Sequence, residues 1–340
     1  MPDIAHQYRG SLLDQVHKGH IVVADHTGKI LWKWGEPERM TFARSSAKPM
    51  QAIPVVESGA LERYGISERE LAVICASHNG EAFHVEAVTS ILNKAGLTPD
   101  ALRCGAEYPM YVPAEDALKK AGVPRAPIYC DCSGKHAGML ITACCRQEPL
   151  ESYDRPEHPV QRRIQSVVAD VCGVAEEEIQ TAVDGCGVPV HALPLYRFAQ
   201  GYARMSLPEL FPEPRASAVR RITGAMTAYP EMVAGSERIC TQLMSNFGDR
   251  LFCKSGASAF YAVGLKGKGI GIALKMEDGA SSIVPYAILE VLRFLGVISR
   301  EEAESVPGFQ DRKIYNNHHA EVGRTELVFH LEPGQSDRAG

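Results

Sequence analysis

The sequence of 340 residues contains no stretch that approaches eighteen consecutive apolar residues, so we expect no transmembrane helix. It also contains no run of basic residues, and a formal net charge of -5 argues against an electrostatic footprint for nucleic acid. Residues 1–4 show neither the basic region nor the apolar region of a secretory leader. We therefore expect a cytoplasmic protein that acts on a small molecule, with no nucleic-acid or membrane partner.

Paired Cys-x-x-Cys spacings, which are typical of structural zinc sites, are also missing, although the chain has ten cysteines. Ten cysteines in a chain of this length without a leader do not form the pattern of a disulfide framework. We expect them to be buried thiols, metal ligands or reactive groups. The composition is otherwise ordinary, because 45% hydrophobic residues are enough for a full core.

A serine and a lysine stand three residues apart in the segment 43–51, Ala-Arg-Ser-Ser-Ala-Lys-Pro-Met-Gln. Ser45 suits the N-cap of a helix, and Pro49 is tolerated in a first helical turn. Residues i and i+3 share one helix face, so Ser45 and Lys48 are expected within hydrogen-bond reach. This predicts a serine nucleophile with its base, provided that burial or a second cation lowers the pKa of the lysine.

Two further elements follow in an order that supports a catalytic interpretation. Ser-His-Asn at 77–79 comes after a short apolar segment, and Lys-Ser-Gly at 254–256 comes late in the chain. Together with Ser-x-x-Lys they form the signature of penicillin-recognising serine hydrolases and class A β-lactamases. The alternative is that Ser77 or Asn79 only caps the next helix.

Two clusters combine thiols with charged side chains. Residues 130–136, Cys-Asp-Cys-Ser-Gly-Lys-His, precede an expected helix, and residues 183–189 place Asp184 in a glycine-rich turn. Cys132 and Cys186 could each give a thiolate to zinc, with a water and a third group completing a tetrahedron. The alternative is that both thiols are small buried side chains beside a turn.

The fold class expected from the apolar patterns is α+β, with a five-stranded antiparallel sheet flanked by helices. The strands are expected at 20–25, 29–33, 250–254, 259–265 and 269–275. The main helices are expected at 83–95, 114–120, 133–145, 158–171, 214–228, 237–246 and 282–295. We expect a single hydrolase domain over 1–340, with an ordered core at about 9–331 and short terminal tails.

In this order and spacing, the motifs resemble the asparaginase II family, the rhizobial type of L-asparaginase. The segments that carry the resemblance are RSSAKPMQA, SHNGE, CSGKHAGM, DGCGVPV, MVAG and KSGA. The resemblance covers about residues 20–331 and implies hydrolysis of L-asparagine to aspartate and ammonia. It also implies a β-lactamase and glutaminase-like fold and a homodimer.

The resemblance further implies which residues form the site. The catalytic residues would be two Ser-Lys pairs, Ser45 with Lys48 and Ser77 with Lys254. One zinc ion per subunit would be held by Cys132, Lys135 and Cys186. A lysine ligand is unusual because the amine must be neutral. Five residues are hypothesised to hold the α-carboxylate and α-amine of the substrate: Arg44, Asn79, Glu81, His136 and Asp184.

Two positions depart from the family pattern. Asp131 stands where asparagine is expected in many relatives, and it adds negative charge near the zinc site. Ser258 stands where an acidic residue often follows Lys-x-Gly-Ala, which puts an acid-base role at that position in doubt. Neither departure touches the two Ser-Lys pairs.

The expected mechanism is attack by Ser45, activated by Lys48, on the side-chain amide carbon, followed by release of the acyl-enzyme by water. Backbone N–H groups near Ser45 would hold the oxyanion. Zinc is expected to orient substrate-binding groups rather than to take part in the chemical step. The alternatives are a glutaminase or penicillin-recognising serine hydrolase and a non-enzymatic zinc or thiol regulatory protein on a hydrolase scaffold.

Overall fold

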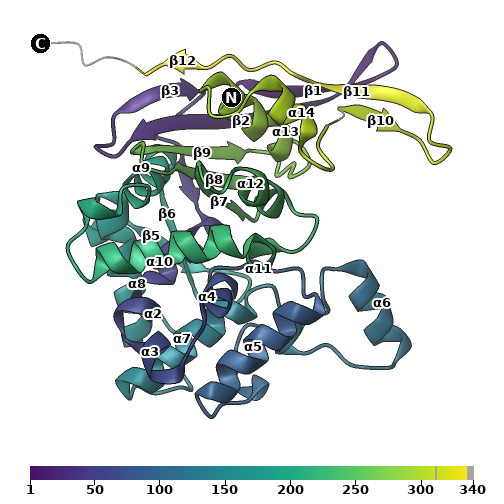
Figure 1. Ribbon diagram of the computed structural model, residues 1–340. Helices are drawn as coiled ribbons and strands as arrows, with labels where there is room; N and C mark the ends of the chain where they lie inside the picture. Colours follow the sequence, from purple (N-terminus) through teal and green to yellow (C-terminus); the bar gives the residue numbers. More distant parts are fainter. Residues whose placement is uncertain (311, 335–340) are drawn as a thin grey trace, which may run out of the picture.

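A curled antiparallel sheet forms one end of the molecule, and most of the helices lie on one side of it (Figure 1). The computed structural model describes residues 1–310 and 312–334. Within this part the sheet has nine strands, of which seven follow the order β10-β11-β1-β2-β9-β8-β7. The other two strands are β3, which pairs with β2, and β12, which pairs with β3. The α+β class is thus confirmed, whereas the expected number of five strands is wrong.

The strands of the large sheet come from both ends of the chain. They are β1 (Asp3–Arg9), β2 (Leu12–Asp25), β3 (Ile30–Trp34), β7 (Leu251–Gly256), β8 (Phe260–Leu265), β9 (Ile270–Met276), β10 (Lys313–Tyr315), β11 (Glu321–Leu327) and β12 (Glu332–Pro333). β1 and β12 lie in segments that we expected to be terminal tails. The remainder of the expected C-terminal tail, residues 335–340, lies outside the described residues.

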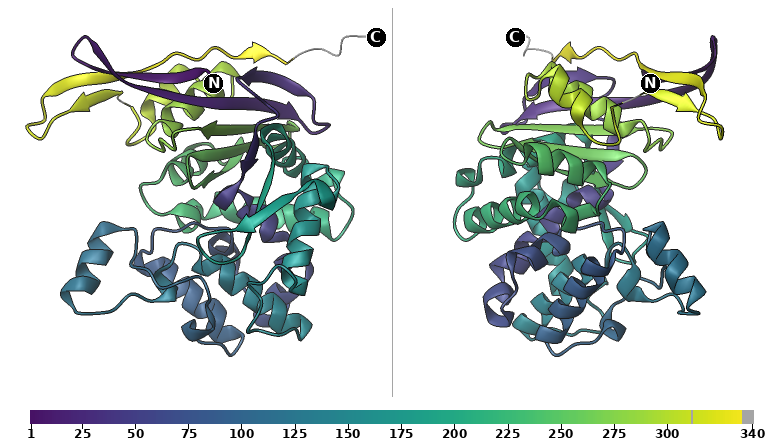
Figure 2. Two further views of the ribbon diagram at one scale, coloured as in Figure 1. Left: turned by 180° about the vertical axis from the view of Figure 1, so that it is seen from behind. Right: turned by 45° about the vertical axis from the view of Figure 1, so that its right-hand side comes forward.

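A second, three-stranded sheet lies between the large sheet and the lower helices (Figure 2). Its order is β4-β6-β5, formed by β4 (Met40–Phe42), β5 (Gln180–Val183) and β6 (Pro189–Pro194). The turn between β5 and β6 carries Asp184 and Cys186. This sheet therefore brings two of the expected site residues to the strand that leads into residue 44.

Helices cover the large sheet and form most of the remaining structure. They are α1 (Lys48–Gln51), α2 (Ile53–Glu57), α3 (Ala60–Tyr64), α4 (Glu68–Ile74), α5 (Ala82–Lys94), α6 (Val112–Lys120), α7 (Ser133–Arg146), α8 (Pro159–Cys172), α9 (Leu195–Met205), α10 (Arg215–Ala228), α11 (Pro230–Ala234), α12 (Ile239–Phe247), α13 (Val284–Phe294) and α14 (Arg300–Ser305). The seven main helices expected from the sequence are confirmed within a few residues at each end. None of the helices in the described residues is both long and apolar enough to span a membrane.

Helices pack against the central strands of the large sheet. Helix α9 packs on β2, β8 and β9, and α13 also packs on β9 (Figure 1). All six residues of β8 are buried, so side chains on both faces of this strand are covered. The expectation that helices flank the sheet is confirmed by this burial.

Close backbone packing fixes the start of α7 against the end of α4. A Cβ atom on Gly134 would lie 2.1 Å from the carbonyl oxygen of Val73, so only glycine allows this approach. Helix α4 itself begins with a capping box, in which the Ser67 hydroxyl accepts from the N–H of Glu70. The packing places the polar segment that follows α4 beside the cysteine-rich segment that precedes α7.

The strand β7 is fixed in the same way against the 3-10 turn η1 (Arg44–Ala47). The Ser46 hydroxyl donates to the carbonyl oxygen of Lys254 at 2.7 Å, and a Cβ atom on Gly256 would lie 2.5 Å from the carbonyl oxygen of Ala43. The Tyr202 hydroxyl in turn donates to the carbonyl oxygen of Ser46 at 2.7 Å. The Ser-x-x-Lys and Lys-x-Gly segments, about 200 residues apart in sequence, are therefore in direct contact.

Candidate active site

Ser45 lies inside a helical turn rather than at its start, so the expected N-cap is wrong. The turn η1 begins after Ala43, and α1 begins at Lys48 after Ala47. In the part of the chain that the structure describes, neither turn has a side-chain cap. Ser45 is the second residue of η1, so its hydroxyl does not cap that turn. The half-buried side chain instead lines a cavity.

The hydrogen bond of the Lys48 amine goes to Ser77. Lys48 Nζ donates to Ser77 Oγ at 2.6 Å, and both side chains are buried. This differs from the expected contact between Lys48 and Ser45. The i, i+3 spacing places those two residues on neighbouring turns, but the long lysine side chain extends to the segment that follows α4. The structure thus joins one residue from each of the two expected Ser-Lys pairs.

Three contacts hold the segment that carries Ser77. The N–H of Ser77 donates to the carbonyl oxygen of Val233 at 3.0 Å, and the N–H of His78 donates to that of Asp131 at 3.2 Å. The His78 ring nitrogen Nε2 lies 2.8 Å from the hydroxyl oxygen of Ser133. Since these contacts lead to α11 and to the start of α7, the Ser77 hydroxyl has a fixed position.

The two buried lysines have opposite pKa directions. Burial lowers the pKa of Lys254 to about 8, with the positive charge of Lys48 acting in the same direction and Cys240 opposing it. Burial also acts to lower the pKa of Lys48, but the negative charges of Cys132 and Asp131 outweigh it and raise that pKa. At neutral pH, therefore, Lys48 is an ammonium, whereas Lys254 is the amine that releases a proton more easily.

Arg44 joins the serine turn to the turn between β5 and β6. Its Nε and Nη2 atoms lie 2.9 Å and 2.7 Å from Oδ1 of Asp184, and Asp184 also accepts from the N–H of Gly185 at 2.8 Å. Arg44 adopts a left-handed backbone with φ of +50°, which costs about 1–2 kcal/mol for a residue other than glycine. Such strain directly before Ser45 is typical of functional sites.

A cavity of about 330 Å³ lies over these residues. It is lined by Arg44, Ser45, Cys104, Glu107, Tyr108, Met110, Cys130, Asp131, Cys132, Asp184, Gly185, Cys186 and Ala257. Five of the twelve expected site residues are in this lining. Lys48 lies directly behind it, with Nζ 3.7 Å from a carboxylate oxygen of Asp131.

Asn79, Glu81 and His136, which we expected to hold the substrate, lie outside this lining and contact other parts of the protein. The Glu81 carboxylate accepts from the N–H and the hydroxyl of Ser236 at 3.3 Å and 3.0 Å. His136 is fully buried, its Nδ1 atom lies 2.7 Å from the Tyr153 hydroxyl, and burial lowers its pKa to about 3. These contacts hold the fold together around the site.

Sequence reasoning gave no role to several residues that line the cavity. Asp131 was noted only as a departure, and Tyr108 and Met110 lie in a segment without a recognisable motif. Proximity of Asp131 to Lys48 depends on how α7 packs, since the two residues are 83 positions apart in sequence. For Asp131 the available signal was its place between two cysteines. For the aromatic and apolar lining there was no such signal.

The expected zinc ligands lie close together. Lys135 Nζ donates to Cys186 Sγ at 3.1 Å, and hydrogen bonds to Cys130 and Cys186 lower the pKa of Cys132. All ten cysteines of the chain are free thiols. Two ligands of a tetrahedral zinc ion, one sulfur at about 2.3 Å and one nitrogen at about 2.0 Å from the metal, lie about 3.5 Å apart. The distance between Lys135 Nζ and Cys186 Sγ would therefore have to increase only slightly to admit the ion.

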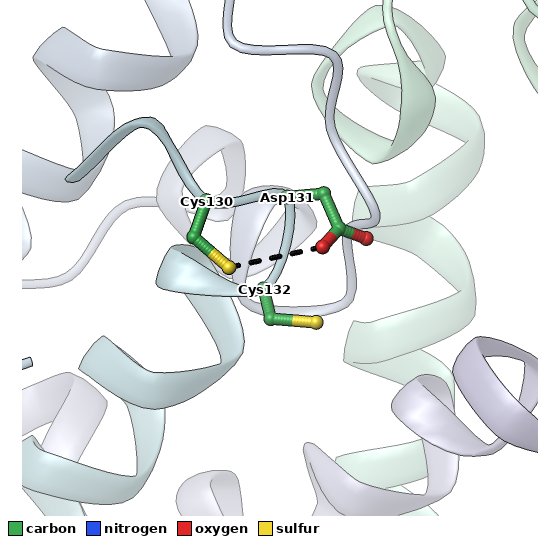
Figure 3. A group of neighbouring side chains, drawn as sticks. All are labelled: Cys130, Asp131 and Cys132. Carbon is green, nitrogen blue, oxygen red and sulfur yellow. Dashed lines mark hydrogen bonds between the residues drawn. The ribbon is translucent and has the colours of Figure 1, made fainter. Parts of the chain in front are cut away.

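A second donor group overlaps the expected one. The donor atoms of Cys130, Asp131 and Cys132 all lie within 4.8 Å of one another (Figure 3). The thiol chemistry of both groups fits zinc, and they share Cys132. Burial acts to lower the pKa of Lys135, but the negative charges of Cys186 and Cys132 raise it. A metal held by Lys135 would therefore have to displace a proton.

Comparison with known proteins gives one match along the sequence. The model of a family described as L-asparaginase II matches residues 5–327. No curated protein matches the sequence. A solved structure of Mglu in its native form in the presence of 4.3 M NaCl has 13% identity and a TM-score of 0.42, covering 83% of this chain. The chain spans 61% of that structure. A second structure of Mglu has 15% identity and a TM-score of 0.37, and the match covers 88% of this chain and 72% of that structure.

Proposed function

Because this chain belongs to the L-asparaginase II family, an amidohydrolase family, we propose that it hydrolyses the side-chain amide of L-asparagine to aspartate and ammonia. The observation that carries this proposal is the pair of buried lysines packed behind the cavity that Ser45 lines. Lys48 is hydrogen-bonded to Ser77, and the segment of Lys254 is bonded to the turn that carries Ser45. Amide hydrolysis by a serine requires such a base, because the hydroxyl is a weak nucleophile when protonated.

Ser45 is the proposed nucleophile because it lines the cavity, whereas Ser77 is buried and bonded to Lys48. The Ser45 oxygen attacks the amide carbon while its proton passes to a neutral lysine amine. Lys254 is the better acceptor because burial lowers its pKa to about 8. The tetrahedral intermediate then collapses, ammonia leaves with the returned proton, and an ester of Ser45 remains. Water hydrolyses this ester and releases aspartate.

Lys48 has a different proposed role. Its charge is held by Asp131 and Cys132, so it remains an ammonium at neutral pH. The ammonium donates to Ser77 and keeps positive charge near the oxyanion that forms during attack. Backbone N–H groups of the η1 turn would hold that oxyanion. Arg44 lines the same cavity and is the proposed partner of the substrate α-carboxylate.

Zinc is proposed as a bound ion with Cys132, Lys135 and Cys186 as its ligands. It would supply a positive charge that holds the start of α7 to the turn between β5 and β6. Both of these segments line the cavity, so their position decides the shape of the substrate site. The serine and the two lysines already account for attack and proton transfer, and the ion is therefore assigned to binding.

The direct test is ammonia release by the purified protein from L-asparagine, L-glutamine and a chromogenic β-lactam, with and without a chelator. We expect release from L-asparagine, with kcat/KM rising as pH passes through about 8. Rapidly quenched enzyme should carry an aspartyl ester that peptide mapping places on residue 45. Ser77→Ala is the matched control, because it removes a second hydroxyl of the same network. An ester found on Ser77, or absence of turnover with all three substrates, would contradict the proposal.

A further inference from the structure

We propose that Asp131 receives the α-ammonium group of the substrate and so makes the site selective for amides of α-amino acids. The inference rests on the proposed amide hydrolysis at this cavity and adds a specificity determinant to it. Asp131 lies between Cys130 and Cys132, ahead of α7 (Figure 3).

Three carboxylates line the cavity, and two of them are unsuited to this role. Asp184 is already engaged by the Arg44 guanidinium at 2.7 Å and by the N–H of Gly185 at 2.8 Å. Glu107 is exposed, and no ion pair or side-chain hydrogen bond joins it to the lysines or serines of the site in the described residues. This leaves Asp131 as the half-buried carboxylate close to the proposed reacting groups.

The Asp131 carboxylate has remaining capacity to accept a hydrogen bond. One oxygen faces the Cys130 thiol at 3.8 Å, and the other points away from it and lies 3.7 Å from Lys48 Nζ (Figure 3). Charge-assisted N–H···O bonds are about 2.7–2.9 Å long, so the 3.7 Å contact is an ion pair without a hydrogen bond. Its remaining protein partners are the Ser77 hydroxyl and the Cys132 thiol. With 32% of the side chain exposed, the carboxylate remains open to the cavity.

The position of Asp131 complements that of Arg44. An α-amino acid carries a carboxylate and an ammonium on one carbon, so its recognition requires a cation and an anion in one cavity. Arg44 comes from η1 and Asp131 from the segment before α7, and both are in the lining. A substrate that lacks the α-ammonium would leave the Asp131 carboxylate partly desolvated, and its binding is disfavoured for that reason.

The test compares L-asparagine with succinamate, the same amide acid without the α-amino group. In the wild type we expect kcat/KM for L-asparagine to exceed that for succinamate by on the order of 10- to 100-fold, as for a charge-assisted hydrogen bond. Asp131→Asn keeps the shape of the side chain and removes its charge. It should lower kcat/KM for L-asparagine by a similar factor relative to that for succinamate, so that the ratio of the two values approaches one. Glu107→Gln is the matched control, and it should keep the wild-type ratio.

Three results would overturn the proposal. Equal rate losses on both substrates would show that Asp131 acts through Lys48. Loss of bound zinc from Asp131→Asn, measured by elemental analysis, would place Asp131 among the metal ligands. Equal kcat/KM for both substrates in the wild type would refute the proposal even if the variant does not fold.

Failure of the proposed hydrolysis can be separated from failure of this inference. If neither amide is turned over, calorimetric titration with L-aspartate and succinate still tests the ammonium site. The inference then requires that the wild type binds L-aspartate more tightly than succinate. It is refuted if the two ligands bind with equal affinity, or if neither ligand binds.

Discussion

Replacing Lys254 by methionine should abolish turnover and yet make the folded protein more stable at neutral pH. The amine is fully buried, and burial is the largest cause that lowers its pKa from 10.5 to about 8. The charged form is therefore less favourable in the folded state than in the unfolded state. The difference between the two pKa values corresponds to roughly 3 kcal/mol of unfolding free energy. Methionine has a similar stem and carries no charge, so most of this cost should be recovered.

The expected gain depends on pH in a definite direction. Below pH 8 both states carry the proton, and the folded state bears the full cost of the buried charge. Between pH 8 and 10.5 the folded state releases its proton while the unfolded state keeps it, so wild-type stability rises with pH. Above pH 10.5 the cost is absent. The gain from Lys254→Met should therefore be full at pH 7 and small near pH 10.5.

Urea unfolding at pH 7 and at pH 10 measures the effect, and ammonia release from L-asparagine measures the loss of activity. Lys48→Met is the matched control, because the pKa of Lys48 is raised and its charge is held by Cys132 and Asp131. That variant should be less stable than the wild type at pH 7. If Lys254→Met is destabilised at both pH values, or if it keeps near wild-type turnover, the assignment of Lys254 as a buried base is wrong.

Three further predictions concern the nucleophile, the metal and the packing of α7. Ser45→Ala should lose turnover. Its free energy of unfolding should change by less than about 1 kcal/mol, since the hydroxyl caps no helix. Normal ammonia release by this variant would refute the assignment of Ser45 as the nucleophile. Cys132→Ser and Cys186→Ser should each lose bound zinc, and each should raise KM more than it lowers kcat. If these variants instead lose kcat as completely as Ser45→Ala does, the metal takes part in the chemical step. Gly134→Ala should lower the free energy of unfolding by about 1–3 kcal/mol, because the new Cβ atom would meet the carbonyl oxygen of Val73. Gly224→Ala in α10 is the control: its Cβ atom meets open space, so the free energy of unfolding should rise by about 0.5–1 kcal/mol. Equal melting temperatures of the two variants would contradict this prediction.

The helices and the central strands could be predicted from the sequence because their apolar periodicity is strong. Three of the missed strands, β1, β5 and β10, lack this signal. β5 is exposed at all four positions, and β10 has exposed residues at both ends. β1 has only two buried residues, which stand next to each other rather than alternating. Each of these strands pairs with the next strand along the chain, β5 with β6, β10 with β11 and β1 with β2. Pairing of backbone groups leaves no trace in the apolar pattern, so alternation cannot reveal it.

The motifs located the candidate site, but the contacts within it depend on tertiary packing. Ser45 and Lys48 were identified by their spacing, whereas the hydrogen bond from Lys48 to Ser77 arises because tertiary packing brings the segment after α4 to the Lys48 side chain. Glu81 and His136 lie in the right motifs but contact Ser236 and Tyr153. A short motif fixes which residues are near a site and leaves open the direction in which each side chain points.

The pairing of β2 with β9 has a consequence for synthesis on the ribosome. Val22 pairs with Ala273, so the inner edge of β2 must wait for about 250 further residues to be translated. At typical rates of translation this takes roughly 10–50 s. During that time residues 21–24, all fully buried in the folded protein, lack the strand that later covers this edge. An unpaired apolar strand edge is prone to aggregation, and this edge stays unpaired until the C-terminal third of the chain has emerged.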